Sequence, residues 1–332
     1  MIIAEIGQAH DGSLGNAHAF IDALATTGVD AIKFQTHIAE AESSQFEPFR
    51  VKFSKQDSTR YDYWKRMEFS ADQWIGIKEH CDAVGLEFIS SPFSNAAVDL
   101  LENLGVSQYK IGSGEVGNFL MLEKIAKTGK PIILSSGMSS FEELDHTFEF
   151  LKPFGNSLSI LQCTTAYPTQ PAQWGLNVMD ELKNRYQVPV GFSDHSGDIF
   201  ACLAAASLGA EIFEFHVVFD KRQFGPDSPA SISIDQTSLL CKGIRDIQLA
   251  LQSPIRKSDN EKYSELKVMF GKSLSVNKVL PAGHILELSD LEAKKPGDKG
   301  IPAKDYQQVV GKKLIKGLDK WDFLNVEDLE KL

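Results

Sequence analysis

Two histidines each end a short apolar run and have the chemistry of metal ligands. His195 ends the run Gly191–His195, and His216 ends the run Glu214–His216. If the two runs are neighbouring strands, the imidazoles can meet and hold a borderline divalent metal. Water would fill the remaining coordination positions and leave room for substrate oxygens. The alternative is two separate structural histidines.

A second group of residues suits an anion. The segment Lys110–Glu115 places a lysine beside a Gly-Ser-Gly turn, and Ser135–Met138 repeats the small hydroxyl and glycine pattern. Such turns let backbone N–H groups approach phosphate oxygens, and lysines add charge. The candidate phosphate ligands are Lys33, Lys110, Ser113, Ser135, Ser136 and Ser193. A single turn of this kind is usually only a turn, so the prediction rests on the combination.

Carboxylates accompany these groups. Glu5 ends the first apolar run and Glu115 follows the fourth, and a buried carboxylate there can act as a general base or acid. The alternative is a simple ion pair with Lys33 or Lys110. Asp227 follows a Gly-Pro turn, and it either faces the same pocket or only forms the turn.

The elements that must position these residues are eight short apolar runs, each followed by a helix-like stretch. The runs are Ile2–Ile6, Asp30–Gln35, Glu87–Ser91, Gln108–Ile111, Pro131–Ser135, Ser159–Cys163, Pro189–Ser193 and Ile212–His216. The clearest helical patterns are Asn16–Thr27, Ala71–Val84, Ala96–Leu104, Phe141–Leu151, Phe200–Leu208 and Ile234–Leu251. Continuous apolar runs are typical of buried parallel strands. Eight such units predict a (β/α)₈ TIM barrel of the α/β class, whose catalytic groups lie at the C-terminal strand ends.

Size and charge limit the possibilities further. The 332 residues exceed one barrel of roughly 250 residues, which predicts a second domain. A formal charge of −11 disfavours nonspecific nucleic-acid binding. No apolar run is long enough for a membrane span, and no basic leader precedes the first strand. The four cysteines form no CxxC pair, so we expect a reduced, cytoplasmic protein.

The domain organisation follows from the change of pattern along the chain. We expect a catalytic barrel over residues 1–251, a polar linker over 252–272 and a small mostly-β domain over 273–332, where short β-like runs alternate with Pro/Gly turns. The segment Ala39–Glu68 is long, polar and aromatic. It is either a substrate lid or a surface insertion.

The ordered motifs resemble the sialic acid synthase family, the phosphoenolpyruvate-dependent nonulosonate synthases. The motifs are Ile3–Gly7, Lys33–His37, Ser91–Ser94, Tyr109–Glu115, Ser135–Met138, Cys163–Thr164 with Tyr167–Thr169, Gly191–His195 and Gly225–Asp227. The resemblance covers nearly the whole chain, and residues 273–332 resemble the family's antifreeze-like domain. It implies condensation of phosphoenolpyruvate with an open-chain N-acetylated hexosamine, with release of phosphate by C–O cleavage.

The resemblance also implies roles for individual residues. Phosphoenolpyruvate is held by the phosphate ligands named above, and His195 and His216 carry Mn²⁺ or Mg²⁺. Glu5, Lys33 and Glu115 are the implied catalytic residues. The implied sugar-side residues are Gln35, Ser91, Tyr167, Asp227 and Lys295. The resemblance also implies a domain-swapped homodimer, in which the segment Lys295–Gly297 reaches the neighbouring subunit's sugar site.

The chain departs from the N-acetylneuraminate enzymes mainly on the sugar side. Ala9 and Thr165 replace asparagines, Ser91 replaces a threonine, and Lys295 replaces an arginine. Lysine lacks the planar fork of arginine. The acceptor is therefore N-acetylmannosamine, the 2,4-diacetamido-trideoxyhexose used for legionaminic acid, or another modified sugar. Two other functions stay open: a metal-dependent aldolase or isomerase acting on a phosphorylated sugar, and a carbohydrate-binding or spore-coat assembly protein without turnover.

Overall fold

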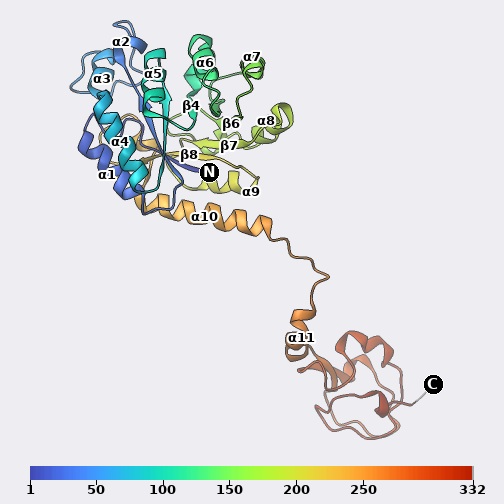
Figure 1. The fold of residues 1–332 in the computed structure, drawn as a ribbon. Helices are drawn as coiled ribbons and strands as arrows, with labels where there is room; N and C mark the ends of the chain where they lie inside the picture. The colour runs from blue at the N-terminus through green and yellow to red at the C-terminus, as the bar shows by residue number, and fades with distance from the viewer. Residues whose placement is uncertain (331–332) are drawn as a thin grey trace. The chain divides into compact units, whose positions relative to one another are not determined.

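Eight parallel strands form the centre of the first part of the chain, in the order β3-β2-β1-β8-β7-β6-β5-β4 (Figure 1). The computed structural model describes residues 1–330, and the chain divides into two units, Met1–Ser253 and Pro254–Leu332. The strands are β1 Ile2–Glu5, β2 Ala31–Thr36, β3 Glu87–Pro92, β4 Tyr109–Ile111, β5 Ile132–Ser135, β6 Leu158–Cys163, β7 Val190–Asp194 and β8 Phe213–Val218. Strands β3 and β4 lie side by side, so the barrel is nearly closed.

Helices alternate with the strands and surround them (Figure 1). They are α1 Leu14–Leu24, α4 Ala71–Ala83, α5 Asn95–Leu104, α6 Phe119–Ala126, α7 Phe141–Leu151, α8 Val178–Tyr186, α9 Phe200–Ser207 and α10 Ile234–Gln252. Ser70 and Ser140 begin α4 and α7 with capping boxes. The predicted (β/α)₈ barrel is confirmed, although α6 and α8 were not identified from the sequence pattern.

A small apolar layer inside the barrel supports the strand ends. It consists of Ile3, Ala31, Ile89, Ile133 and Leu161, with Ile212 packed against it. Side chains two residues apart on a strand share a face. The next residues on that face are Glu5, Lys33, Ser91, Ser135, Cys163 and Glu214. The strand period therefore places a layer of polar side chains directly after the apolar one.

Strand register brings three of the predicted site residues together. Glu5 pairs with Lys33 on one side of β1 and with His216 on the other. The central position of β1 in the sheet thus joins a carboxylate, a lysine and an imidazole that lie far apart in the sequence.

The segment Ala39–Glu68 folds into two short helices, α2 Ala39–Glu42 and α3 Arg60–Met67, with irregular chain between them. Its own apolar side chains hold it together: Tyr63, Trp64 and Met67 are buried. Phe49 and Phe53 pack against this cluster. The segment is therefore an ordered part of the first unit with a core of its own.

The second unit, Pro254–Leu332, has little regular structure. The segment expected as a linker carries a 3₁₀ turn and helix α11, Ser264–Phe270. Strands β10 Ser273–Val276 and β11 Leu291–Lys294 pair antiparallel, and isolated bridges link the rest. Leucines and other aliphatic residues, among them Leu274 and Leu324, form a separate small core.

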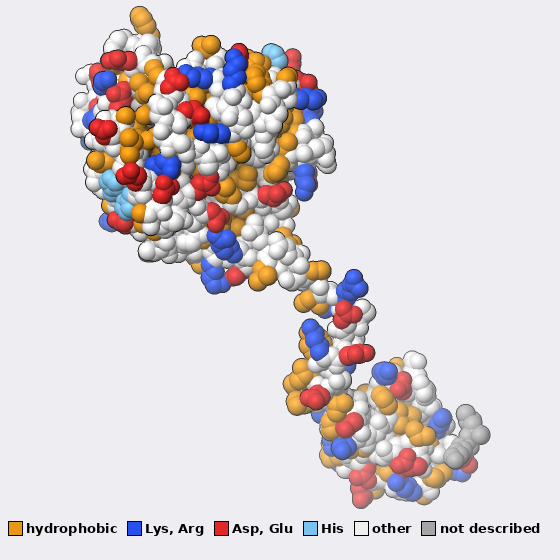
Figure 2. Space-filling model, viewed as in Figure 1, with side chains coloured by type: hydrophobic (Ala, Val, Ile, Leu, Met, Phe, Trp, Pro, Cys, Tyr) orange, Lys and Arg blue, Asp and Glu red, His pale blue; other side chains and the backbone are white. Residues whose placement is uncertain are grey.

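The visible surface of the first unit mixes charges of both signs. Figure 2 shows Lys and Arg side chains interspersed with Asp and Glu on this face. Across residues 1–330, no helix combines the length and the apolar character that crossing a bilayer requires.

Gly191 tests the packing of the barrel, because a Cβ there would collide with the Ile212 carbonyl and the Leu161 side chain. We expect Gly191→Ala to lower the free energy of unfolding by about 1–3 kcal/mol, since the neighbours are backbone and core. Chemical denaturation followed by circular dichroism measures this. Gly117 has no atom within 4 Å of the corresponding position, so Gly117→Ala is the control. Equal stability of the two variants would contradict this packing.

Candidate active site

A cavity of about 430 Å³ opens at the C-terminal ends of the barrel strands. It brings together most of the predicted site residues: Glu5, Lys33, Gln35, Ser91, Lys110, Ser113, Glu115, Ser135, Tyr167, Ser193, His195, His216 and Asp227. Two predicted residues do not line it. Ser136 is buried and donates to the Leu161 carbonyl at 3.1 Å. Lys295 belongs to the second unit, where its ammonium lies 5.0 Å from the centroid of the Phe270 ring.

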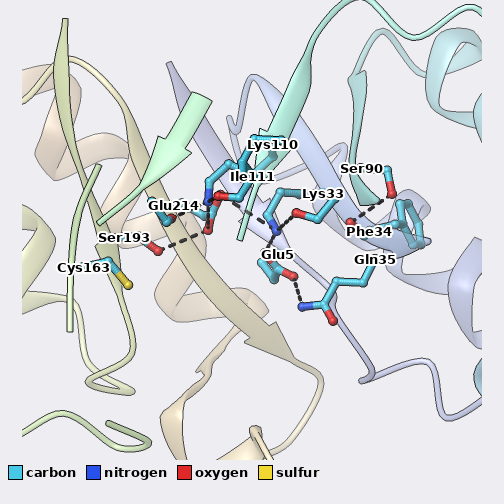
Figure 3. Close-up of polar contacts among 12 residues, drawn as sticks. Glu5, Lys33, Phe34, Gln35, Ser90, Lys110, Ile111, Cys163, Ser193 and Glu214 are labelled. Atoms are coloured by element: carbon cyan, nitrogen blue, oxygen red, sulfur yellow. Dashed lines mark hydrogen bonds and ion pairs between the residues drawn. The ribbon is translucent and has the colours of Figure 1, made fainter. Parts of the chain in front are cut away.

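Buried charges of both signs form the floor of the cavity. Lys33 contacts Glu5 directly and lies 4.0 Å from a carboxylate oxygen of Glu214. Lys110 lies 3.5 Å from the other Glu214 oxygen. Figure 3 shows both lysines pointing toward these acids from separate strands. Two cations and two carboxylates thus neutralise one another out of contact with water.

Neighbouring charges oppose the effect of burial on Glu214 and on the two lysines. Burial opposes charge on Glu214, but Lys110 and Lys33 hold the pKa of its carboxyl below the usual range. Burial also works against Lys33, and the carboxylates Glu214 and Glu5 raise its pKa overall. For Lys110 burial prevails and lowers the pKa, with Lys33 as a second positive charge nearby. An incoming anion would add favourable charge beside Lys110.

Glu214 was not identified as a site residue from the sequence. A signal for it exists, because Glu214 lies two residues before His216 and the strand period places both on one face. The Glu214 side chain is buried at the cavity floor, and only the tertiary contacts show that both lysines lie beside it.

Hydroxyl groups surround the lysines. Ser135 accepts a hydrogen bond from Lys110, and Ser91 accepts one from Lys33 at 3.2 Å. Ser193 donates to Glu214 at 3.1 Å. Ser113 accepts from the backbone N–H of Gly137 at 3.1 Å, which fixes the turn after β5 against the turn after β4. Serine hydroxyl groups and two lysine ammonium groups therefore line one side of the cavity.

The two histidines meet at the cavity wall, with ring centroids 5.3 Å apart. The His195 Nδ1 faces the Thr164 carbonyl at 3.0 Å, and a carbonyl only accepts, so Nδ1 carries the proton. Nε2 faces the Tyr167 hydroxyl at 3.1 Å. A backbone carbonyl that fixes Nδ1–H is a usual support for a metal-ligating imidazole.

Protonation of the two imidazoles differs. Burial lowers the pKa of His216. Burial acts the same way on His195, but the Cys163 thiol group, 3.9 Å away, and the Thr164 carbonyl raise its pKa to about 9. A metal bound at Nε2 of His195 would therefore displace a proton.

Glu115 stands apart from the buried charges. It lies in a 3₁₀ turn, Ser113–Glu115, after β4 and accepts a hydrogen bond from Asn118 at 2.7 Å. Burial raises the pKa of its carboxyl. A carboxyl with a raised pKa at a cavity wall is suited to proton transfer.

The segment Ala39–Glu68 forms the remaining wall and supplies residues that the sequence did not single out. Arg50 pairs with Asp227 at 2.7 Å and lies over the Tyr167 ring, 4.2 Å from its centroid. Gln35 donates to Glu5 at 2.7 Å. The segment thus borders the cavity through Glu42, Glu47, Arg50, Arg60 and Trp64.

The chain is similar to known proteins over most of its length. Residues 20–256 match the NeuB family. The chain is 33% identical to N-acetylneuraminate-9-phosphate synthase of Mus musculus, over 99% of this chain and 92% of the relative. It is 34% identical to N,N'-diacetyllegionaminic acid synthase of Campylobacter jejuni, over 94% of this chain and 95% of the relative.

A solved structure is similar as well. N-acetylneuraminic acid synthetase from Leptospira borgpetersenii, crystallised with citrate, superposes with a TM-score of 0.70 at 29% identity. The match covers 80% of this chain and 90% of that chain. Sequence and fold agree, and the chain belongs to the NeuB family.

Proposed function

We propose that this protein condenses phosphoenolpyruvate with an open-chain N-acetylated hexosamine, giving a sialic-acid-like nonulosonate and phosphate. The observation that carries the proposal is one cavity in which two lysines and several hydroxyls face a pair of histidines. N-acetylmannosamine and a 2,4-diacetamido-trideoxyhexose are the proposed acceptors. An aldolase or isomerase is not favoured, because the named relatives are synthases.

The lysine side of the cavity suits the phosphate and carboxylate of phosphoenolpyruvate. Lys110 and Lys33 supply charge, and Ser113, Ser135 and Ser193 supply hydroxyls. Ser136 makes its hydrogen bonds to the neighbouring strand, so we give it a supporting role for the turn. Bound phosphoenolpyruvate would share both lysines with Glu214 and Glu5.

His195 and His216 fit a divalent metal, which we propose to be Mn²⁺ or Mg²⁺. The tautomer of His195 is fixed by Thr164, and its Nε2 faces the cavity side of Tyr167. No group of three or more His, Cys, Asp or Glu side chains suited to a metal occurs among residues 1–330, so solvent or substrate oxygens must complete the shell. When bound, the metal would polarise the acceptor aldehyde.

The chain's own residues would orient the reactants and handle charge. Carbon 3 of phosphoenolpyruvate forms a bond to the acceptor aldehyde carbon while the aldehyde C=O π bond breaks and its oxygen takes up a proton. Water then adds to the cationic carbon 2 and loses a proton. The C–O bond to phosphate breaks last, and the remaining hydroxyl proton leaves with the phosphate, so that carbon 2 becomes a ketone. Glu115 would either activate this water as a base, to which its raised pKa suits it, or stabilise the cationic carbon as a carboxylate. Glu5, fixed by Lys33 and Gln35, would face the sugar, whose hydroxyls Gln35, Tyr167 and Asp227 would contact.

Replacing His216 tests the metal site. We expect His216→Ala to lose metal binding and turnover, because one of the two imidazoles is gone, while the circular dichroism spectrum stays native. Calorimetric titration with Mn²⁺ after chelation, alongside phosphate-release assays, measures both effects. His146 is exposed and outside the cavity, so His146→Ala should behave as wild type. Wild-type activity of His216→Ala after chelation and Mn²⁺ addition would contradict the assignment.

Replacing Lys110 tests the phosphate side. Loss of a charge-assisted hydrogen bond costs roughly 1.5–3 kcal/mol, about 10- to 100-fold in binding. Lys110→Met should therefore raise the KM for phosphoenolpyruvate by that factor and leave the KM for the sugar little changed. Lys124→Met, which removes a surface lysine paired with Asp99, is the control. Equal weakening of both substrates would argue against this role.

We further propose a domain-swapped homodimer and a cytoplasmic setting. The second unit is small for independent stability, and its Lys295–Gly297 segment resembles the family segment that completes a neighbour's sugar site. A two-fold dimer would let each small domain, proposed to be antifreeze-like, cover the other barrel. The four cysteines are free and buried, which agrees with a reducing compartment.

Mixing two inactive proteins tests the exchange. His216→Ala removes the barrel site and Lys295→Ala removes the proposed contribution to the neighbour. If subunits exchange, a mixed dimer contains one intact composite site, so activity should partly return on mixing. Light scattering gives the oligomeric state and a phosphate-release assay gives the activity. A fully active monomer would refute the proposed dimer.

A further inference from the structure

The wall formed by the segment Ala39–Glu68 has no excess of positive charge. The charged residues that line the cavity on this side are Glu42, Glu47, Arg50 and Arg60 from the segment and Asp227, which follows β8. Three carboxylates against two guanidinium groups give a formal charge of −1. Any ligand at this wall meets a neutral or negative surface.

Arg50 is the cation nearest the predicted sugar-side residues, and its charge is already compensated. Its Nη2 lies 2.7 Å from Asp227, and the carbon of its guanidinium group lies 4.2 Å from the Tyr167 ring centroid. One edge of the guanidinium is thus used by a carboxylate and one face by a ring. Its side chain is still 40% exposed, so the remaining edge is open to a ligand.

Arg60 is similarly engaged. It lies 3.5 Å from Glu47 and 4.3 Å from the Trp64 ring centroid, and burial lowers its pKa. Glu47 is held in turn by the Trp64 indole N–H at 3.1 Å. A second anion would have to displace a carboxylate that has other partners.

These contacts distinguish two kinds of acceptor. A sugar phosphate carries a charge of about −1.5 to −2 near neutral pH and would face Asp227 and Glu47. Sugar hydroxyls and an N-acetyl group carry no charge and can share the open edge of Arg50 and the oxygens of Asp227. Like charges in close contact cost several kcal/mol at a partly desolvated site.

We propose that the Arg50–Asp227 ion pair determines acceptor specificity: because Asp227 compensates the charge of Arg50, which is fixed over Tyr167, the cavity favours an uncharged amino sugar over the same sugar carrying a 6-phosphate. The inference rests on the proposed condensation reaction. It separates this chain from those relatives whose product is named as a 9-phosphate, despite 33% identity to one of them.

The first measurement compares N-acetylmannosamine with its 6-phosphate, using the full-length protein, saturating phosphoenolpyruvate and Mn²⁺. Phosphate release and product mass give kcat/KM for each. We expect the uncharged sugar to be preferred by about 100-fold, the factor that a few kcal/mol of repulsion produces.

The second measurement separates the two halves of the ion pair. Asp227→Asn frees the Arg50 charge, so the preference ratio should move toward the phosphorylated sugar by about tenfold. Arg50→Met leaves Asp227 uncompensated, so the ratio should move away from it by about tenfold. A residue that only supports the fold would shift the ratio the same way in both variants.

Two surface variants serve as controls, because they separate an effect of the cavity ion pair from a general effect of removing a charge. Arg222 and Asp220 form an exposed pair outside the cavity, so Arg222→Met and Asp220→Asn should leave the ratio unchanged. The KM for phosphoenolpyruvate should stay near wild type in all variants, which shows that the barrel is intact. Preference of the wild type for the 6-phosphate, or shifts of one sign in both cavity variants, overturns the role of Arg50. If none of N-acetylmannosamine, its 6-phosphate and the 2,4-diacetamido-trideoxyhexose supports phosphate release, the proposed condensation itself fails.

Discussion

The site depends on one buried carboxylate. Glu214 lies between Lys33 and Lys110, and without it two ammonium groups would be enclosed beside each other with only Glu5 as a counter-ion. Removing one partner of a buried ionic group is costly, because the uncompensated charge remains out of water. Glu214 therefore lets the barrel hold two cations where a dense anion is to bind. The two lysines and the two carboxylates have no net formal charge before the anion arrives. The bound anion would then complement the charge of Lys110.

The buried charges connect the proposed binding positions of the two substrates. Glu5 contacts Lys33 and Gln35, and its strand lies between the strands of Lys33 and His216. The Glu5 carboxylate thus contacts the lysine side and the predicted sugar side, and its strand pairs with the strand of a proposed metal ligand. Orientation of the reactants would come from one rigid strand, β1, whose neighbours are fixed on both sides. A mechanism that asks mainly for positioning and charge is well served by such a frame.

The opposite wall is built differently. The segment Ala39–Glu68 has its own aromatic cluster, and Arg50 reaches across to Asp227 and Tyr167. Tyr167 in turn stacks on His195, with centroids 4.2 Å apart. The segment Ala39–Glu68 is therefore connected to the proposed metal ligand through the side chains of Arg50 and Tyr167. Under the proposed function, changes in this segment would alter acceptor choice while the lysine side stays the same.

The sequence by itself determined the barrel and the end of it that carries the chemistry. Buried strands and amphipathic helices have local periods, and the parallel order places every polar strand end on one face. Only the tertiary structure showed that Ser136 turns to the next strand, that Glu214 joins both lysines and that Arg50 meets a residue 177 positions away. Those contacts depend on the directions of side chains and on the paths of loops. Neither repeats at a regular interval along the sequence. Charge balance inside a cavity is a property of the assembled fold, so spacing along the chain cannot reveal it.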